Sequence, residues 1–215
     1  NVTLPHKAAV LPLLDEVDAV AKRIGAANTI IVRSDGSLFG SNTDAFGFIE
    51  SLKAGAPAGW RADAAPAVVL GAGGASRAVI VALLDAGVAE LRLANRSRET
   101  AEALAAEFGP AIGVIDWDER AGALGGAGLL VNTTSLGMVG KPPLELALDD
   151  LPKTALVSDI VYTPLQTGLL AGAAARGNPV VDGLGMLLHQ GRPGFAAWFG
   201  TDPAVTPELR RAVLD

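Results

Sequence analysis

The sequence predicts an α/β fold built on a doubly wound parallel sheet. From residue 67 onward, short apolar segments alternate with helical segments, as expected for parallel strands that helices cover on both faces. A glycine-rich loop joins the first of these strands to the next helix. Half of the 215 residues are hydrophobic and 19% are charged, so the chain can bury a substantial core.

The first forty residues predict one helix and a pair of strands. We expect a helix from Pro5 to about Ile24, ended by Gly25, and a strand at Thr29–Arg33. Residues 34–37 (Ser-Asp-Gly-Ser) predict a turn, because Asp and Gly tolerate the backbone angles that turns need. A short second strand at Leu38–Gly40 would then return beside the first.

A second helix and a connector follow. The helix is expected from Ala45 to about Ala54, with Thr43 or Asp44 as its N-cap. Residues 55–66 are rich in Gly, Ala and Pro, which indicates a connecting segment.

Beyond the connector the pattern is βαβ. The expected strands are Ala67–Leu70, Glu90–Ala94, Ile112–Ile115, Leu129–Asn132, Leu156–Asp159 and Pro179–Val181. The expected helices are Ala75–Ala86, Ser97–Phe108 and Leu165–Arg176. The tail from Gly183 to Asp215 is expected to be helical and need not belong to the sheet.

Composition excludes several classes of protein. A net charge of -6 argues against a nucleic-acid binder, which usually has a basic face. The chain has no cysteine, so disulfides and thiol catalysis are excluded, and a reducing cytoplasm suits it. With His6 and His189 as the two histidines, no multi-histidine metal site is expected. No uncharged apolar run reaches about 18 residues, so no transmembrane helix is expected.

The glycine loop predicts a dinucleotide site of the Rossmann type. Gly71 allows the tight turn, Gly73 lets the backbone approach a pyrophosphate, and Gly74 opens a helix whose N–H groups are free. Position six of the fingerprint is Ser76, where Gly or Ala is usual. A glycine turn that only packs a helix on a sheet is the alternative.

The end of the next strand favours NADP over NAD. NAD-preferring sites place Asp or Glu there to hold the ribose 2′-hydroxyl, whereas this chain has Asn95-Arg96-Ser97-Arg98. A guanidinium can pair with a 2′-phosphate, which a carboxylate would repel. The alternative is that both arginines are solvated loop charges.

Lys7 and Asp44 are candidates for proton transfer, because a neighbouring lysine and carboxylate can pass a proton to a substrate hydroxyl. Pro5 suits the first turn of a helix, which would place Thr3 and Lys7 near its start. Each candidate also has a structural explanation: Lys7 as a surface lysine, Asp44 as a helix cap and Asn28 as a turn residue.

Taken together, these segments resemble the shikimate dehydrogenase family. Eight motifs occur in the family's order: NVTLPHK, GAANT, NTD, GAGGASRA, NRS, NTTSLGM, DIVYTPLQTGLL and DGLGMLLHQG. The resemblance implies an NADP-linked interconversion of shikimate and 3-dehydroshikimate in aromatic amino-acid biosynthesis. It runs from Asn1 to the end of the chain.

The resemblance also implies roles for particular residues. Lys7 would assist proton transfer at the reacting hydroxyl, and Asp44 would orient it and contact the substrate. The implied substrate-binding residues are Thr3, Asn28, Tyr162 and Gln190. The cofactor-binding residues are Gly71, Gly73, Gly74, Ala75, Asn95, Arg96, Ser97 and Arg98, with Thr133, Thr134, Gly183 and Met186 at the nicotinamide end. For His189 a packed or solvated helix histidine is expected, and Tyr162 could equally be a core residue.

The implied organisation is a central Rossmann domain, residues 44–182, beside an incomplete α/β substrate domain. Residues 1–43 and the C-terminal helices, 183–215, would form that second domain, with the active site in the cleft. The family begins with a further strand–helix region carrying a Ser-x-Ser pair, which this sequence does not contain, so we expect a chain lacking its N-terminal segment.

Three functions stay open. The first is an NADP-dependent shikimate dehydrogenase, and the second is a quinate or aminoshikimate dehydrogenase, or one that uses NAD. The third is an NADP-binding module without turnover. The expected partner is a small molecule, with no nucleic acid or membrane, and a monomer or homodimer is expected.

Overall fold

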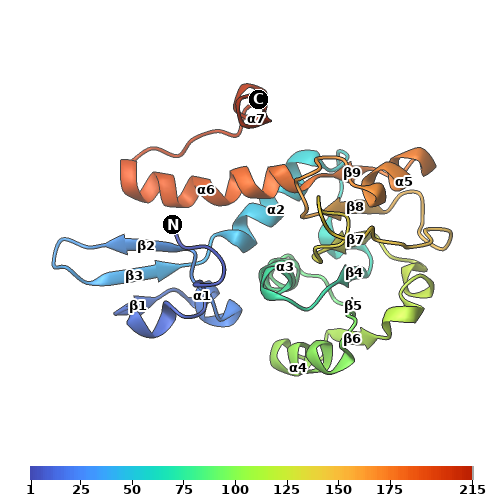
Figure 1. Cartoon of the computed structure of the whole chain (residues 1–215), viewed down its shortest axis with the longest axis horizontal. Coiled ribbons are helices and arrows are strands. Elements are labelled where there is room, and N and C mark those ends of the chain that lie inside the picture. Colours follow the sequence, from blue (N-terminus) through green and yellow to red (C-terminus); the bar gives the residue numbers. More distant parts are fainter. Residues whose placement is uncertain (215) are drawn as a thin grey trace.

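The structure, a computed structural model, describes residues 1–214 and contains two sheets (Figure 1). The larger sheet has the strand order β6-β5-β4-β7-β8-β9, and each neighbouring pair is parallel. The strands are β4 (Ala67–Leu70), β5 (Leu91–Ala94), β6 (Ile112–Ile115), β7 (Leu129–Asn132), β8 (Leu156–Asp159) and β9 (Val180–Val181). This confirms the expected fold class and places every expected strand of the sheet within one residue.

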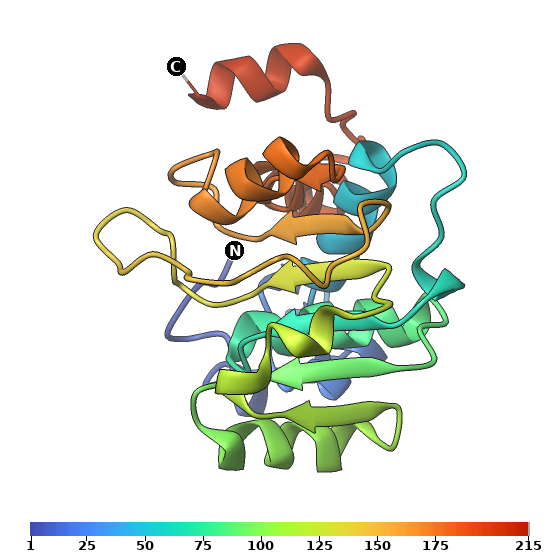
Figure 2. The ribbon, with the colours of Figure 1, turned by 90° about the vertical axis from the view of Figure 1, so that its right-hand side faces the viewer.

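The direction of winding reverses at β4. The chain adds β5 and β6 on one side of β4 and then returns to add β7, β8 and β9 on the other. The carboxyl ends of all six strands therefore lie along one edge, where the arrowheads point the same way in Figure 2. In an open α/β sheet, ligands bind at the carboxyl edge where the winding reverses.

Both faces of this sheet are covered. Alternate residues of β4 point into different cores: Ala67 and Val69 into one, Val68 and Leu70 into the other. The first core includes α3 (Gly74–Asp85) and α4 (Arg98–Phe108), and the second includes α5 (Gly168–Arg176). This double burial explains why the strands are almost continuously apolar.

The smaller sheet has the order β1-β3-β2, formed by β1 (Glu16–Val17), β2 (Thr29–Val32) and β3 (Leu38–Ser41). The expected strand pair is confirmed: β2 and β3 are antiparallel, and Thr29 lies opposite Ser41. β1 joins β3 in parallel, which the sequence did not predict.

The helix expected from Pro5 to Ile24 is wrong. Turns at residues 4–10 lead to a short 3₁₀ helix, η1 (Leu11–Leu13), then to β1 and to α1 (Ala19–Ile24). Pro12 has no backbone N–H and its ring opposes a continuous helix. Pairing with β3 then extends the chain, because Asp15 and Asp18 donate backbone N–H groups to carbonyls of that strand at 3.0 and 2.9 Å.

Two further elements differ from expectation by more than one residue. α5 begins at Gly168, three residues after the predicted start, because Thr167 is its N-cap and accepts from Leu170 N. The helical tail is divided into α6 (Gly183–Phe199) and α7 (Pro207–Leu214), and Gly200 ends α6 with φ +72°. Asp215, expected to be helical, lies outside the described residues. The other 3₁₀ helices are η2 (Ala62–Ala64), η3 (Trp117–Glu119) and η4 (Gly122–Leu124).

α2 (Asp44–Gly55) and α6 connect the two sheets (Figure 1). α6 starts beside the large sheet and extends to the small one, where Trp198 Nε1 donates to Ile30 O at 3.2 Å. The helices approach closely at Gly47, where a Cβ would lie 2.6–2.8 Å from Gln190 Cβ, N and Cα. The predicted domain boundaries fall at the first residues of α2 and α6, and this division stays a prediction.

No helix within residues 1–214 combines the length and apolar character needed to span a membrane. In the same part of the chain, no three His, Cys, Asp or Glu side chains gather as metal ligands would.

Candidate active site

Lys7 and Asp44 form an ion pair. Lys7 Nζ donates to Asp44 Oδ2 at 2.6 Å, although the two residues are far apart in the sequence. Their side chains keep 22% and 14% of their surface exposed, so the pair is accessible but shielded from bulk solvent. The pair can therefore exchange a proton with a small molecule that enters beside it.

Different elements hold the two partners. Asp44 is the first residue of α2, and its backbone N–H donates to Asn42 Oδ1 at 2.9 Å. Lys7 lies in the N-terminal turns, not at the start of a helix as expected, because no α-helix forms there. Its carbonyl accepts from Ala27 N at 2.8 Å, and Val2 N donates to Asn28 O at 2.7 Å, which fastens the turns to the strand β2 region.

Asn28 is buried, and its side chain makes hydrogen bonds to several residues of the site. Its Nδ2 donates to Asp44 Oδ1 at 2.8 Å and to Thr43 Oγ1 at 2.9 Å. Its Oδ1 accepts from Thr43 N at 3.0 Å and from Thr29 Oγ1 at 2.9 Å. Because both ends of the amide are engaged, Asn28 orients the carboxylate of Asp44 in a fixed direction.

Gln190 reaches the same point from α6. Its Oε1 accepts from Asn28 Nδ2 at 3.3 Å, and its Nε2 donates to Leu187 O at 3.0 Å. Gly47 permits this contact, because any side chain at that position would collide with the backbone of Gln190.

These residues line one cavity of about 280 Å³. The predicted residues in its wall are Thr3, Lys7, Asn28, Asp44, Tyr162, Gly183, Met186 and Gln190. Tyr162 is 49% exposed, which excludes the alternative that it is a core residue. Ile160 and Leu187 also line the cavity, and the sequence reasoning had not singled them out.

A larger cavity of about 730 Å³ lies on the other side of α2, against residues 56–63 and the end of α3. None of the predicted site residues lines it. We therefore place the chemistry in the smaller cavity, where the ion pair and the amide groups converge.

The glycine loop fits a dinucleotide. Gly71 has φ +104°, and a Cβ there would lie 2.8 Å from Thr133 Oγ1, so only glycine suits this position. At Gly73 and Gly74 a Cβ would meet no atom within 4 Å, which leaves space over the start of α3. Gly73 is the N-cap and provides no side-chain acceptor, so the helix offers free N–H groups to an anion.

Ser76, the departure from the fingerprint, is fully buried. Its hydroxyl donates to Gly73 O at 2.5 Å. A serine is tolerated at this position because it is small and because its polar atom is satisfied within the loop.

The segment Asn95–Arg98 follows β5 beside this loop. Asn95 Oδ1 accepts from Ala72 N at 3.2 Å, and Asn95 Nδ2 donates to Ser97 O at 2.9 Å, which joins the segment to the glycine loop. Ser97 caps α4 through Thr100 N. Arg96 is exposed, and no ion pair engages it within the part of the chain that the structure describes.

Arg98 is arranged differently from Arg96. Its guanidinium pairs with Asp116 at 2.6 Å and with Glu102 at 2.7 Å. The hydrogen bonds that Arg98 donates to Asp116 and to Glu102 raise its pKa above the ordinary value. Because those contacts occupy its guanidinium, Arg96 is the better placed of the two to meet a 2′-phosphate.

Among the residues predicted for the nicotinamide end, Thr133 is held against the glycine loop and its Oγ1 donates to Leu70 O at 2.7 Å. Thr134 donates from its backbone and its hydroxyl to Asn132 Oδ1, at 3.0 and 2.7 Å. Gly183 opens α6 so close to Ile160 O that a Cβ would lie 2.3 Å away. Met186 follows one turn later in the wall of the cavity.

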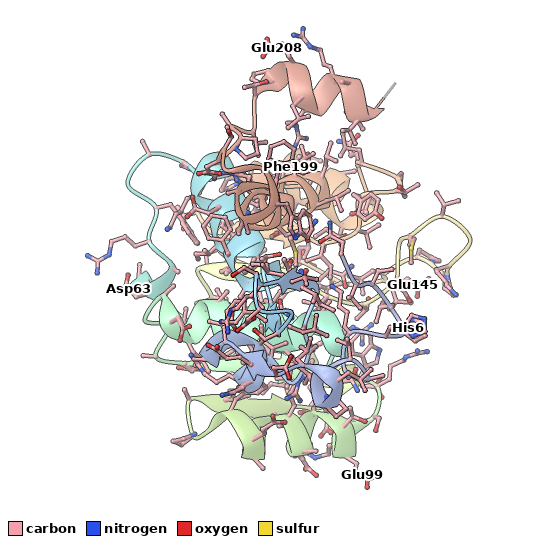
Figure 3. All side chains as sticks on the ribbon, turned by 90° about the vertical axis from the view of Figure 1, so that its left-hand side faces the viewer. His6, Asp63, Glu99, Glu145, Phe199 and Glu208 are labelled. Carbon is pink, nitrogen blue, oxygen red and sulfur yellow. The ribbon has the colours of Figure 1, made fainter. Side chains whose placement is uncertain are left out.

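The two histidines lie outside the cavity. His6 is exposed at the surface (Figure 3), and His189 is 9% exposed, beside Arg192 at 3.4 Å. Burial first, and the positive charge of Arg192 second, lower the pKa of His189. This confirms the expectation of a packed helix histidine.

Sequence reasoning missed Asp159 and Asn132. Both are fully buried at the carboxyl ends of neighbouring strands, and Asn132 Nδ2 donates to Asp159 Oδ1 at 3.0 Å. The available signal was a polar residue closing an apolar strand in each case.

Fold and site together define a dinucleotide-binding α/β protein with a lysine–carboxylate pair beside the nucleotide edge of its sheet. The chain matches two family descriptions: shikimate dehydrogenase substrate binding domain over residues 1–30, and shikimate / quinate 5-dehydrogenase over residues 57–142. A shikimate dehydrogenase (NADP(+)) from Paramagnetospirillum magneticum is 61% identical over 214 residues, which cover 100% of this chain and 77% of the relative. The corresponding protein from Dinoroseobacter shibae is 59% identical with the same coverage.

Solved structures agree. Quinate dehydrogenase from Corynebacterium glutamicum in complex with NAD has a TM-score of 0.91 at 36% identity, covering 100% of this chain and 76% of that one. Shikimate 5-dehydrogenase from Thermus thermophilus in complex with NADP(H) and shikimate has a TM-score of 0.82 at 43% identity. The match covers 95% of this chain and 74% of that one. The chain belongs to the shikimate dehydrogenase family, whose members are oxidoreductases.

Proposed function

We propose that this protein is an NADP-dependent oxidoreductase that interconverts shikimate and 3-dehydroshikimate in aromatic amino-acid biosynthesis. The observation that carries the proposal is the Lys7–Asp44 pair at 2.6 Å, in a cavity whose wall also contains Asn28, Gln190 and Tyr162. Relatives at 55–61% identity are named shikimate dehydrogenase (NADP(+)), which supports both the substrate and the cofactor.

Oxidation of a secondary alcohol to a ketone removes a hydride from carbon and a proton from oxygen. When bound, NADP(H) supplies the hydride chemistry at its nicotinamide ring. The protein's task is to hold the hydroxyl and to take up or return its proton.

Lys7 and Asp44 are suited to that task. Asp44 Oδ2 holds the amino group of Lys7, and Asp44 Oδ1 holds the amide of Asn28, so the carboxylate fixes both neighbours at once. In the oxidation direction, Lys7 assists removal of the hydroxyl proton while Asp44 orients the substrate; in reduction the proton moves back. Confinement in a half-buried cavity strengthens these charged contacts compared with bulk water.

The remaining polar groups would select the substrate. Thr3, Asn28 and Gln190 present hydroxyl and amide groups for ring hydroxyls, and Tyr162 would lie near the substrate carboxylate. A site that hydrogen-bonds several hydroxyls discriminates strongly against analogues that lack one, because its buried polar groups are then left unpaired.

The glycine loop, Ala75 and the Asn95–Ser97 segment would hold the pyrophosphate and the adenosine half of NADP(H). Exposed Arg96 would pair with the 2′-phosphate. Thr133, Thr134, Gly183 and Met186 would surround the nicotinamide.

Quinate oxidation with NAD is the second candidate, because the quinate dehydrogenase from Corynebacterium glutamicum, solved in complex with NAD, superposes on this chain with a TM-score of 0.91. Arg96, in place of an acidic residue, favours NADP. We further propose that the protein acts in the cytoplasm as a monomer or homodimer. Its expected partners are small molecules alone.

Initial rates measured with shikimate and quinate, each with NADP and with NAD, test the proposal. We expect the highest kcat/KM for shikimate with NADP. A preference for NAD would contradict the role of Arg96, and a preference for quinate would support the second candidate. Binding of NADP(H) without turnover of either acid would indicate a nucleotide-binding module instead.

A further inference from the structure

The carboxyl edge of the large sheet contains a buried acid that the proposed reaction does not use. Asp159, the last residue of β8, is fully buried. Its Oδ1 accepts from Asn132 Nδ2 and from Val161 N, each at 3.0 Å, and its Oδ2 accepts from Thr167 Oγ1 at 2.7 Å. Within residues 1–214 no cation pairs with it, and burial raises its pKa above the ordinary value.

Through Asn132, Asp159 anchors the turn after β7. The two residues are direct neighbours in the register of β7 and β8. Asn132 Nδ2 is held by Asp159, and this fixes Asn132 Oδ1 toward the backbone and hydroxyl of Thr134. Thr134 Oγ1 then accepts from Leu136 N at 3.0 Å. Asn132 Nδ2 also donates to Leu136 O at 3.2 Å, so the amide of Asn132 orients Thr134 and the end of this turn, while Thr133 is held by Leu70.

Through its other contacts, Asp159 anchors the loop after β8. It holds the loop near its start at Val161 N and at its end at Thr167, the N-cap of α5. Between these anchors, Tyr162 is exposed to the cavity. The carbonyls of this loop also press on Gly183, where a Cβ would lie 2.3 Å from Ile160 O and 2.7 Å from Val161 O.

The two segments are joined a second time, since Val139 N donates to Thr163 O at 2.9 Å. One segment belongs to the nicotinamide end of the proposed cofactor site and the other to the substrate side. Asp159 is the side chain that bonds, directly or through Asn132, to both.

We propose that Asp159 is a positioning residue that holds the turn after β7 and the loop after β8 in one arrangement. In this arrangement the nicotinamide end of the cofactor site faces Tyr162 and the substrate cavity. Asp159 acts through Asn132, Val161 and Thr167, and its own surface is closed to ligands. The inference rests on the proposed function for the identity of the ligands.

Two variants test it: Asp159→Asn, which replaces one acceptor with a donor facing Thr167, and Thr167→Val, which removes the donor to Asp159 together with the side-chain N-cap of α5. Asp149→Asn is the matched control, since the Asp149 side chain is 92% exposed. The first measurement needs no turnover. It compares the dissociation constant for NADPH with that for 2′-phospho-ADP-ribose, which has no nicotinamide.

We expect Asp159→Asn to weaken NADPH binding about tenfold, comparable to the loss of one ordered polar contact, while the fragment keeps its affinity within about twofold. Thr167→Val should show a smaller change in the same ratio. A purely structural role would lower the active fraction and leave both dissociation constants unchanged. An NADPH-to-fragment ratio in both variants equal to that of Asp149→Asn would overturn the proposal.

Steady-state kinetics add a second measurement. With shikimate and NADP, the kcat/KM of Asp159→Asn should fall on the order of 100-fold, as expected for a displacement of about 1 Å at the reacting groups. If the unmodified protein does not oxidise shikimate, the proposed function fails, while the binding ratio still decides the role of Asp159. If Asp159→Asn does not fold, the ratio measured in Thr167→Val decides it.

Discussion

Gly47→Ala tests whether the contact between α2 and α6 sets the geometry of the site. Gly47 is buried inside α2, directly below Gln190 of α6. An added Cβ would lie 2.6 Å from Gln190 Cβ, 2.7 Å from its N and 2.8 Å from its Cα, whereas ordinary contacts of this kind begin near 3.4 Å. Two of these three atoms are backbone, so a change of side-chain rotamer cannot relieve the overlap.

The helices must therefore move apart by roughly the missing distance, about 0.7 Å. Overpacking of this kind costs about 1–3 kcal/mol, and the better helix propensity of alanine returns about 0.5–1 kcal/mol. We expect a net loss of about 1–2 kcal/mol in the free energy of unfolding, which lowers Tm by roughly 2–8 °C in a chain of this size. The same movement would lengthen the 3.3 Å contact between Gln190 Oε1 and Asn28 Nδ2 beyond hydrogen-bonding range.

The assay is kcat and KM for shikimate, together with thermal unfolding. We expect KM for shikimate to rise about tenfold or more, because Gln190 no longer shares the amide of Asn28. Gly191→Ala is the matched control: it lies next to Gln190 in α6, and a Cβ there would meet no atom within 4 Å. It should keep KM and raise the stability by up to about 1 kcal/mol. Unchanged KM and Tm in Gly47→Ala would refute the reasoning.

Three further predictions follow from the site. Lys7→Ala should lower kcat about 10²- to 10⁴-fold, as for loss of a proton-transfer group, without changing the dissociation constant for NADPH; turnover equal to that of the exposed control Lys153→Ala would rule out the role of Lys7. Arg96→Ala should raise KM for NADP about 10- to 100-fold through loss of charged hydrogen bonds and leave KM for NAD unchanged, with exposed Arg211→Ala as control. An unaltered ratio of the KM for NADP to the KM for NAD would contradict this role of Arg96. For His189, the lowered pKa in the folded state means that folding favours the neutral ring. The resulting stability is complete above the ordinary value of 6.5 and is lost as pH falls from there through the lower folded-state pKa. Denaturant unfolding between about pH 5 and 8 should show this decline, and His189→Gln should reduce it; identical pH profiles would exclude His189 as the cause.

The sequence determined the large sheet almost completely, because the signals are local. Each strand is a short apolar run, and Gly71, whose positive φ and close approach to Thr133 require glycine, marks the turn after the first of them. The preference for NADP also came from a local feature, Arg96 at the end of a strand. The strands were predicted within one residue because burial on both faces leaves little choice of residue type.

The tertiary structure decided what depends on distant partners. The segment from Pro5 to Ile24 has helical composition, yet Pro12 interrupts it and pairing with β3 draws Glu16 and Val17 into a strand. Lys7 and Asp44 were paired by resemblance alone, and only the fold shows the 2.6 Å contact and the amide of Asn28 that orients it. The sequence marked Asp159 only as a polar residue closing an apolar strand; its burial and its three donors come from separate segments that only the folded sheet brings together.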